Sequence, residues 1–237
     1  MIQDTMAVPQ SLTDFLNSWP TLKVIHRSDP NFETIKPGFL SSPDVQLLIV
    51  RPQDEQDAAA LIGHLTSTSV PFTIRAGGHD ISSRFVAQDA VQIDLRDIAH
   101  VHVSDDKSFA RVGGGVITQD LLNALAEQEL MAVFGNAASV GWCAWAMNGG
   151  YGIMSGKYGL GCDQIIGARV VLASGDVVEA DERLLKALRG AGTAFGAIIE
   201  LRIKVYSLTK VWKLRLCERH QSLMGITDDV RLDRLRT

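Results

Sequence analysis

The sequence has only three cysteines in 237 residues, and this small, odd number excludes a disulfide framework. Cys143, Cys162 and Cys217 are too widely spaced for a zinc site, so we expect reduced thiols. Basic residues are also few: 23 lysines and arginines stand against 27 acidic residues, which gives a net charge of −4. Because binding a phosphate backbone generally requires a basic surface, we expect no nucleic-acid partner.

Long hydrophobic runs are missing as well. The longest hydrophobic segment extends from Ala137 to Met147 and is interrupted by Ser139 and Gly141. It is far shorter than the ~20 residues needed to span a bilayer. Residues 1–20 have neither a basic start nor a continuous apolar stretch, so no signal peptide is visible. We therefore expect a soluble protein with no membrane partner, cytoplasmic rather than secreted.

Hydrophobic residues make up 46% of the chain and charged residues 21%, which is ordinary for a globular protein with a sizeable core. The 21 glycines cluster mostly at the ends of apolar runs, at 77–78, 113–115, 149–152 and 190–196. Glycine at the end of a strand allows a sharp turn or the close approach of another group. These clusters are therefore the first places to search for a binding site.

The spacing of apolar residues predicts a mixed α+β fold. We expect helices at 11–19, 53–66, 118–129 and 184–188, and Ser11 is expected to cap the first of them. We expect strands at 44–51, 72–75, 91–95, 100–103, 109–112, 165–173, 177–179 and 197–206. Segment 44–75 forms a β–α–β unit in this prediction. The strands fall into two clusters, about 40–112 and 113–206.

The segment Ile74–Ile81, IRAGGHDI, is the most informative in the chain. Two glycines directly after a strand can expose several backbone N–H groups in a tight curve, and such a concavity binds anions, for example a diphosphate. The alternative is a Gly-Gly turn beside a surface histidine. The short string GGH does not decide between these interpretations by itself.

This segment closely resembles the vanillyl-alcohol-oxidase/berberine-bridge-enzyme family of FAD-linked oxidases. Arg75, Gly77, Gly78 and His79 match that family's Arg-x-Gly-Gly-His motif, and Asp80 stands where the family often has Ser, Asn or Asp. The resemblance implies that the backbone of 75–81 wraps the FAD pyrophosphate. It also implies that His79 is bonded covalently to the flavin's 8α-methyl carbon.

Two later blocks, in the same order as in the family, extend the resemblance over about residues 40–206. The second block matches at Val140, Gly141, Gly149, Gly150, Tyr151, Gly152, Lys157, Tyr158, Gly159, Leu160 and Asp163. The third runs from Ala187 to Ile198 and resembles an Arg-Gly-x-Gly…Phe-Gly-Ile/Val element. Three blocks in order are far more specific than any one of them.

The resemblance implies a p-cresol-methylhydroxylase (PCMH)-type FAD-binding domain made of two α+β subdomains with FAD between them. We expect this domain at 41–207, with subdomains at 41–112 and 113–207. An N-terminal helical extension at 1–40 precedes it, and an unassigned tail at 208–237 follows it. The cofactor-binding residues that it implies are Arg75, Ala76, Gly77, Gly78, His79, Asp80, Ile81, Ala137, Val140, Gly141, Trp142, Gly149, Gly150, Tyr151, Gly152 and Ile198.

The sequence departs from the family in the second block. Ala137 stands where doubly linked members have a cysteine, so only the histidyl link is expected. Cys143 replaces a glycine and is either a packing residue or a second tether; packing is favoured because free cysteine is commonly buried. Trp142 and Trp145 replace small residues and either crowd the isoalloxazine ring or belong to the core, which is the favoured interpretation.

Two other motifs carry less weight. Gly190-x-Gly192 precedes a β-branched run, whereas a Rossmann phosphate loop opens a helix after a strand. His100 and His102 alternate to one face of a strand and could bind a metal, but a third ligand in register is missing. We expect exposed histidines there, and no metal site.

The resemblance implies an FAD-dependent oxidoreductase or oxidase. In such an enzyme, a small organic substrate of secondary-metabolite, alcohol or sugar-like type transfers hydride to covalently bound FAD, and molecular oxygen is the acceptor. Family members normally continue for a further substrate domain, so the alternative is a truncated, catalytically idle flavin-binding remnant or a partner-dependent module. The sequence names neither the substrate, nor a catalytic base, nor an oligomeric state.

Overall fold

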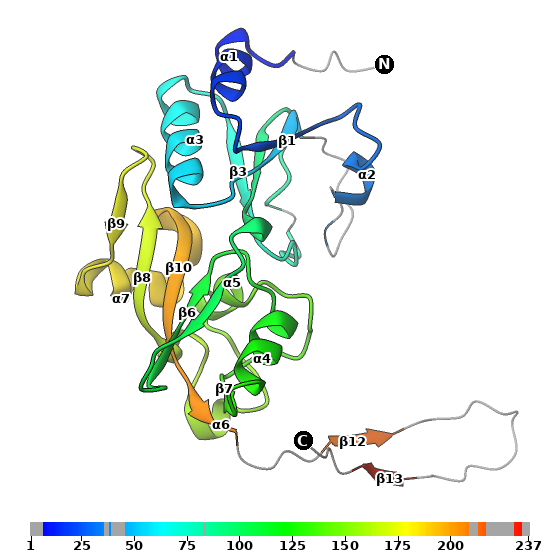
Figure 1. Cartoon of the computed structure of the whole chain (residues 1–237), viewed down its shortest axis with the longest axis vertical. Helices are drawn as coiled ribbons and strands as arrows, with labels where there is room; N and C mark the ends of the chain where they lie inside the picture. Colours follow the sequence, from blue (N-terminus) through cyan, green and yellow to red (C-terminus); the bar gives the residue numbers. More distant parts are fainter. Residues whose placement is uncertain are drawn as a thin grey trace, which may run out of the picture.

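A computed structural model of the chain describes residues 7–35, 38, 46–82, 84–208, 213–216 and 230–233. Two β-sheets with their helices follow one another along the long axis of the molecule (Figure 1). This arrangement confirms the mixed α+β fold that the spacing of apolar residues predicted.

The first sheet has the strand order β1-β2-β4-β3. Its strands are β1 (Lys23–His26), β2 (Leu48–Arg51), β3 (Phe72–Arg75) and β4 (Val91–Asp94). β2 and β3 both pair in parallel with β4, and β1 pairs antiparallel with β2 at the edge. The predicted β–α–β unit therefore forms, but β4 lies between its two strands.

Helix α3 (Glu55–Ser67) makes the crossover from β2 to β3, and α1 (Gln10–Ser18) packs beside it. The Asp54 side chain caps α3 by accepting a hydrogen bond from Asp57 N, 2.9 Å away. In α1, by contrast, Ser11 lies inside the helix, which begins after Pro9 with no side-chain cap, so the predicted role of Ser11 was wrong. Strand β1 and the short helix α2 (Phe32–Ile35) were not predicted.

The second sheet is antiparallel, with the order β5-β6-β10-β8-β9. Its strands are β5 (Val101–Val103), β6 (Phe109–Gly113), β8 (Ile165–Val171), β9 (Val177–Glu179) and β10 (Ala197–Lys204). We expected the strands up to residue 112 to belong to the first subdomain. β6 pairs instead with β10, so the change from one sheet to the other falls between β4 and β5. Pairing with a strand so distant in sequence leaves no local signal.

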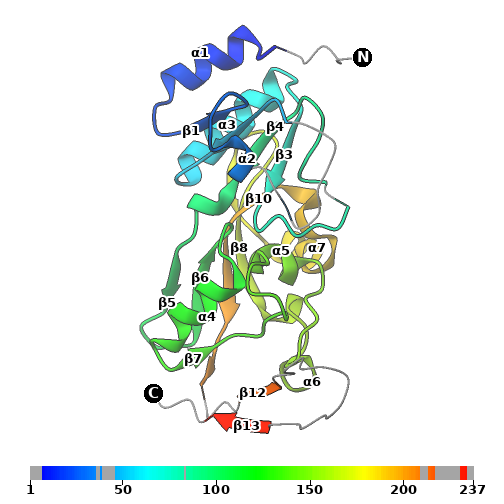
Figure 2. The ribbon, with the colours of Figure 1, turned by 90° about the vertical axis from the view of Figure 1, so that its right-hand side faces the viewer.

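Helices α4 (Thr118–Ala126), α5 (Trp142–Met147) and α7 (Glu182–Ala191) pack against this sheet (Figure 2). Their buried side chains join β6, β8 and β10 in one hydrophobic core. The core of the first sheet includes Val171, Ala197 and Ile199 from the second sheet. The two sheets are therefore held together by shared apolar packing.

The remaining elements are short. They are η1 (Leu95–Asp97), β7 (Leu130–Met131), α6 (Ser155–Tyr158), η2 (Cys162–Gln164), η3 (Gly192–Phe195), β11 (Tyr206–Ser207), β12 (Lys213–Leu216) and β13 (Val230–Asp233). β12 and β13, in the tail for which no fold was predicted, pair antiparallel. Cys217, expected to be a reduced thiol, lies outside the described residues. Within the described ranges, no helix combines the length and apolarity that a bilayer crossing requires.

Candidate functional site

Two segments that contain predicted cofactor-binding glycines meet where the two sheets join. The loop after β3 contains Gly77, and the segment that leads into α5 contains Gly141. A Cβ added to Gly77 would lie 2.2 Å from Gly141 N, and one added to Gly141 would lie 2.6 Å from Gly77 N. The two backbones therefore touch at a point where neither residue has room for a side chain.

The segment before α5 is fixed by the first turn of α4. Gln119 N donates to the Ala138 carbonyl over 2.9 Å, and Thr118 N donates to the Val140 carbonyl over the same distance. The Thr118 hydroxyl also donates to the Val140 carbonyl, at 3.1 Å. These bonds satisfy N–H groups that a helix start otherwise leaves without partners, and they hold residues 138–140 in one conformation.

His79 is partly buried at this junction. Its Nε2 atom lies 2.8 Å from the hydroxyl of Ser139, so the hydrogen bond links the loop of the first sheet to the segment before α5. Partial burial, followed by the positive charge of Arg75, lowers the pKa of His79 below its ordinary value of 6.5. The imidazole is therefore mainly neutral at pH 7, and in a neutral imidazole one of the two ring nitrogens carries no hydrogen.

Arg75 points into the protein rather than out of the loop. Its side chain is only 3% exposed, NH1 donates to the Ile35 carbonyl at 2.5 Å, and the guanidinium lies 5.5 Å from the centre of the Phe85 ring. Burial, with a contribution from the charge of Arg96, lowers the pKa of Arg75 to about 10. Arg75 is thus a buried cation whose contacts with Ile35 and Phe85 hold the start of the loop after β3 in place.

Asp80, the residue after His79, is bonded within its own loop. Its carboxylate accepts hydrogen bonds from Arg84 Nε at 2.6 Å and Ser82 N at 2.9 Å. The hydrogen bond from Arg84 is the largest cause of a lowered pKa of Asp80. Ile81, which follows, is 75% exposed, an unusual degree for a large apolar side chain.

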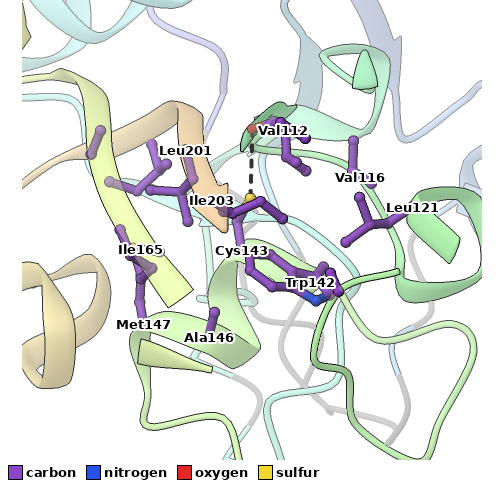
Figure 3. Close-up of a cluster of buried hydrophobic side chains, with 14 of the residues drawn as sticks. Val112, Val116, Leu121, Trp142, Cys143, Ala146, Met147, Ile165, Leu201 and Ile203 are labelled. Carbon is purple, nitrogen blue, oxygen red and sulfur yellow. Dashed lines mark hydrogen bonds between the residues drawn. The ribbon is translucent and has the colours of Figure 1, made fainter. Parts of the chain in front are cut away.

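Trp142 and Cys143 lie on the buried face of α5 (Figure 3). The Trp142 indole donates from Nε1 to the Val133 carbonyl at 2.9 Å, and the Cys143 sulfur lies 3.8 Å from the Val112 carbonyl. Complete burial raises the pKa of the Cys143 thiol, so the reactive thiolate does not form. The favoured interpretations, core for Trp142 and packing for Cys143, agree with this geometry.

The segment after α5 contains further predicted residues. Gly149 and Gly150 have φ values of 100° and 73°, which favour glycine, and a Cβ on Gly152 would lie 2.0 Å from the Phe134 carbonyl oxygen. Trp145 is partly exposed and donates from Nε1 to the Tyr151 carbonyl at 3.2 Å. The Tyr151 side chain itself is 79% exposed.

The predicted residues thus separate into groups. Ala76, Gly77, Gly78 and His79 lie in the loop after β3, which meets the segment that contains Ala137, Val140 and Gly141. The side chains of Arg75, Trp142 and Ile198 are buried in the protein interior. Ser139 was not among the predicted residues, because an exposed serine in a segment of small residues carries no distinguishing pattern.

The two alternative motifs have other surroundings. His100 and His102 stack with ring centres 5.1 Å apart, and His100 Nε2 is 2.8 Å from Glu200 Oε2. No group of three or more His, Cys, Asp or Glu side chains that could hold a metal occurs in the described parts of the chain. Gly190 lies at the end of helix α7 and Gly192 follows it, so they come after a helix rather than a strand, and only the four-residue 3₁₀ helix η3 begins at Gly192, which does not suit a Rossmann phosphate loop.

Comparison with known proteins identifies the family. A family model described as an FAD binding domain matches residues 46–181, more than half of the chain. FAD-linked oxidoreductase aurO from Gibberella zeae is 37% identical over 204 residues, which is 85% of this chain and 40% of that protein. (R)-6-hydroxynicotine oxidase from Paenarthrobacter nicotinovorans is 36% identical over 196 residues, or 79% of this chain and 42% of that protein.

Solved structures show the same fold. The crystal structure of 6-hydroxy-D-nicotine oxidase from Arthrobacter nicotinovorans matches with a TM-score of 0.77 and 34% identity, over 82% of this chain and 44% of that one. The berberine-bridge-enzyme-like protein 1 of Physcomitrella patens matches with a TM-score of 0.78 at 22% identity, over 83% of this chain and 44% of that one.

The chain spans about two fifths of the length of these relatives. The match extends from the first sheet into the second and includes the loop of 75–81 and the segment of 137–152. The fold is that of PCMH-type FAD-binding oxidases, as the motifs predicted. The chain therefore belongs to the FAD-binding domain family, among the FAD-linked oxidoreductases of the vanillyl-alcohol-oxidase/berberine-bridge-enzyme type.

Proposed function

We propose that this chain is the FAD-binding part of an oxidase, and that FAD binds where the two sheets meet and is attached covalently through His79. The observation that carries the proposal is the position of His79. Its ring is mainly neutral at pH 7 and partly exposed, and its Nε2 atom lies 2.8 Å from the Ser139 hydroxyl. Gly77 and Gly141, where a Cβ has no room, lie beside it. The N–H groups of a glycine backbone suit the diphosphate of a cofactor, and a nucleophilic imidazole beside them suits an electrophilic ring.

The residues at the junction fit the two parts of this cofactor. Backbone N–H groups of 76–79 and 139–141 would hold the diphosphate, because glycines let an anion approach the main chain closely. The buried charge of Arg75 adds positive potential behind the loop. The exposed side chains of Ile81 and Tyr151 are candidates to contact the apolar flavin ring.

The activity follows from the cofactor and from the named relatives. Bound FAD supplies a hydride acceptor that molecular oxygen can reoxidise. Relatives include a hydroxynicotine oxidase and a chitooligosaccharide oxidase. We propose a small organic substrate of alcohol, sugar-like or secondary-metabolite type. The part played by this chain is to bind and orient the cofactor.

We expect the purified parent protein to carry FAD covalently and His79→Ala to carry none. The attached group should add the mass of one FAD less two hydrogens, because a C–N bond replaces one C–H and one N–H bond and dioxygen accepts the two hydrogens. Intact mass spectrometry of protein from flavin-rich host cells measures this difference. Digestion should then place the added mass on the peptide that contains His79.

His102→Ala is the matched control, because it removes an exposed histidine far from the junction in sequence. It should retain the full added mass. A parent protein without the added mass, or His79→Ala with it, would reject the proposed attachment. A purified parent protein that has neither yellow colour nor the added mass of FAD would reject flavin binding altogether.

We expect the rate of covalent attachment to rise with pH, with a midpoint below pH 6.5, and to be constant at higher pH. The neutral ring is the nucleophile, and burial and Arg75 lower the pKa of His79, so the ring loses its proton at a lower pH than a free histidine does. Flavin-free protein mixed with FAD and sampled over time by mass spectrometry at pH 5 to 8 gives the profile. A midpoint above 6.5 would contradict the lowered pKa.

Substrate oxidation needs its own experiment, because covalent flavin is also compatible with a module that works only with a partner. Anaerobic mixing with alcohols, sugars and hydroxylated aromatic compounds should bleach the flavin absorbance if this chain can react alone. Bleaching by a chemical reductant but by none of these compounds would favour the partner-dependent module.

A further inference from the structure

We propose that the backbone N–H groups of Gly150 and Tyr151 form a pair of hydrogen-bond donors for the pyrimidine edge of the flavin, its N1 atom and C2 carbonyl. This inference rests on the proposed binding of FAD and assigns a role to the backbone of the segment after α5. The pair holds the end of the flavin ring system that is remote from His79.

Two carbonyls of this segment are turned toward the protein. The Gly149 carbonyl accepts a hydrogen bond from Cys162 N at 3.0 Å, and the Gly150 carbonyl accepts one from Gly161 N at 2.7 Å. These bonds fix the two peptide planes that contain the N–H groups of Gly150 and Tyr151. Because a trans peptide bond places its N–H opposite its C=O, both N–H groups point away from the segment that the carbonyls contact.

The next peptide plane is held at both of its polar atoms. The Tyr151 carbonyl accepts a hydrogen bond from Trp145 Nε1 at 3.2 Å, and Gly152 N donates to Ser155 Oγ at 3.0 Å. The Trp145 ring is itself closely packed, since a Cβ on Gly161 would lie 2.7 Å from its Cζ3 atom. The backbone around Tyr151 is therefore ordered without a ligand, as preorganised donors require.

The N–H groups of Gly150 and Tyr151 donate no hydrogen bond to the parts of the chain that the structure describes. Gly150 is buried, and a buried backbone N–H without a partner is rare and costs free energy. Its φ is 73°, and a Cβ there would lie 2.6 Å from Gly161 Cα, so a side chain is excluded. Two adjacent donors on bare backbone attract a negatively polarised acceptor, which a ligand can supply.

The position of the pair along α5 selects the part of the flavin that it meets. Helix α5 begins after Gly141, which touches Gly77, and its six residues rise about 9 Å at 1.5 Å each. The 8α-methyl carbon, proposed to bond to His79, is at one end of the three fused rings, and the C2 carbonyl is at the other end. A ring system that lies along α5 therefore brings its pyrimidine edge to Gly150 and Tyr151.

This pairing has a consequence for the reduction potential of the flavin. Reduction adds negative charge to the pyrimidine edge, because N1 and the C2 carbonyl share the added electron density. A hydrogen bond to a charged acceptor is roughly twice as strong as one to a neutral acceptor. The N–H pair therefore stabilises the reduced flavin more than the oxidised flavin and raises the potential.

The experiment compares Tyr151→Pro with Tyr151→Ala. Both variants lack the tyrosine ring, but only proline lacks the backbone N–H. Relative to Tyr151→Ala, we expect Tyr151→Pro to lose about tenfold more affinity for the reduced than for the oxidised flavin, because a hydrogen bond to a charged acceptor is lost. This factor corresponds to a two-electron reduction potential that is lower by about 30 mV. Reductive titration of the purified flavoproteins with a reference dye measures it.

An exchange of one amide for an ester gives an independent variant, because proline also constrains the backbone. Incorporation of the α-hydroxy analogue of tyrosine at Tyr151 removes the N–H and keeps the side chain, and it should lower the potential of the parent by a similar amount. The same exchange at Ile153 is the matched control. The Ile153 N–H also makes no hydrogen bond within the described ranges, and its side chain is exposed, so the potential should not change.

Two further readouts separate the flavin ring from the diphosphate. Flavin-free proteins loaded with FAD that carries ¹³C at C2 should show a higher C2 carbonyl stretching frequency in the ester protein than in the parent, because a hydrogen bond weakens the C=O bond. ADP has the diphosphate but no flavin ring. Its dissociation constant for flavin-free protein, from titration calorimetry, should be equal in the parent and the ester protein.

The outcomes distinguish this inference from the proposed function. An unchanged potential in the Tyr151 ester protein would reject the pairing, whatever the proline variant shows. Weaker ADP binding with an unchanged potential would place the N–H pair at the diphosphate and would also overturn the proposal. If the parent bound flavin without a covalent bond, attachment at His79 would be rejected, whereas a lowered potential in the ester protein would still support the pairing. A parent that binds no flavin would reject the proposed function and this inference with it.

Discussion

Replacing Gly77 with alanine is expected to abolish flavin binding, although the change adds a single methyl group. The added Cβ would lie 2.2 Å from Gly141 N and 2.8 Å from the Ser139 carbonyl oxygen. Both are backbone atoms, and side-chain rotation cannot relieve contacts with backbone. The loop after β3 would have to move away from the segment before α5, and the two halves of the proposed site would separate.

The cost in stability should be substantial as well. Overpacking a well-packed site by a methyl group typically costs about 1–3 kcal/mol. We expect Gly77→Ala near the upper end of this range, because the hydrogen bonds from α4 oppose movement of the Ser139 segment. Urea unfolding measures the free energy, and flavin absorbance of the purified protein measures binding.

Gly156→Ala is the matched control. Gly156 lies in α6, has no positive φ, and a Cβ there would meet nothing within 4 Å. It should bind flavin normally and be unchanged or slightly more stable, since alanine favours a helix by up to about 1 kcal/mol. A Gly77→Ala protein that binds flavin like Gly156→Ala would show that the two loops need not touch.

Local sequence patterns predicted most of the strands and the longer helices. β3 and β9 have the predicted bounds, because a β-branched or aromatic run next to a clear turn signal defines both ends. Helix α5 was not predicted, since its six residues are rich in alanine and tryptophan but follow a segment of poor helix propensity. It forms because burial of Trp142 and Cys143 outweighs weak local preference.

The pairing of strands that are distant in sequence could not be predicted from local sequence patterns. β4 inserts between β2 and β3, and β6 pairs with β10, yet neither arrangement alters the spacing of apolar residues within the strands. The division into two strand clusters was therefore predictable, but the residue at which one sheet gives way to the other was not.

The candidate site was predictable from motifs to a similar extent. Glycines at 77 and 141 have the close backbone contact that such residues permit. The inward direction of Arg75 and the contact of Ser139 with His79 depend on how the loops fold over each other, so no local sequence pattern predicts them. The motifs named candidate residues, and the structure separates those that lie at the junction from those whose side chains are buried in the interior.

Trp142→Ala is expected to cost the most stability of any single change considered, about 3–5 kcal/mol. Trp142 is fully buried, packs with α4 and the second sheet, and donates to the Val133 carbonyl at 2.9 Å (Figure 3). Removing the indole leaves a large cavity and a buried carbonyl without its donor. Since whole domains are stable by only about 5–15 kcal/mol, the variant should unfold at a much lower urea concentration than the parent.

A second variant, Trp142→Phe, decides between the two roles considered for this tryptophan. If Trp142 is a core residue, Trp142→Phe should lose about 1–3 kcal/mol, because the ring is largely retained but the Val133 carbonyl loses its donor. Its flavin absorbance spectrum should match that of the parent. Trp145→Phe, at a partly exposed position, should lose less. A Trp142→Phe protein with unchanged stability and a shifted flavin spectrum would instead place the indole against the cofactor, which the packing of α5 against the sheet argues against.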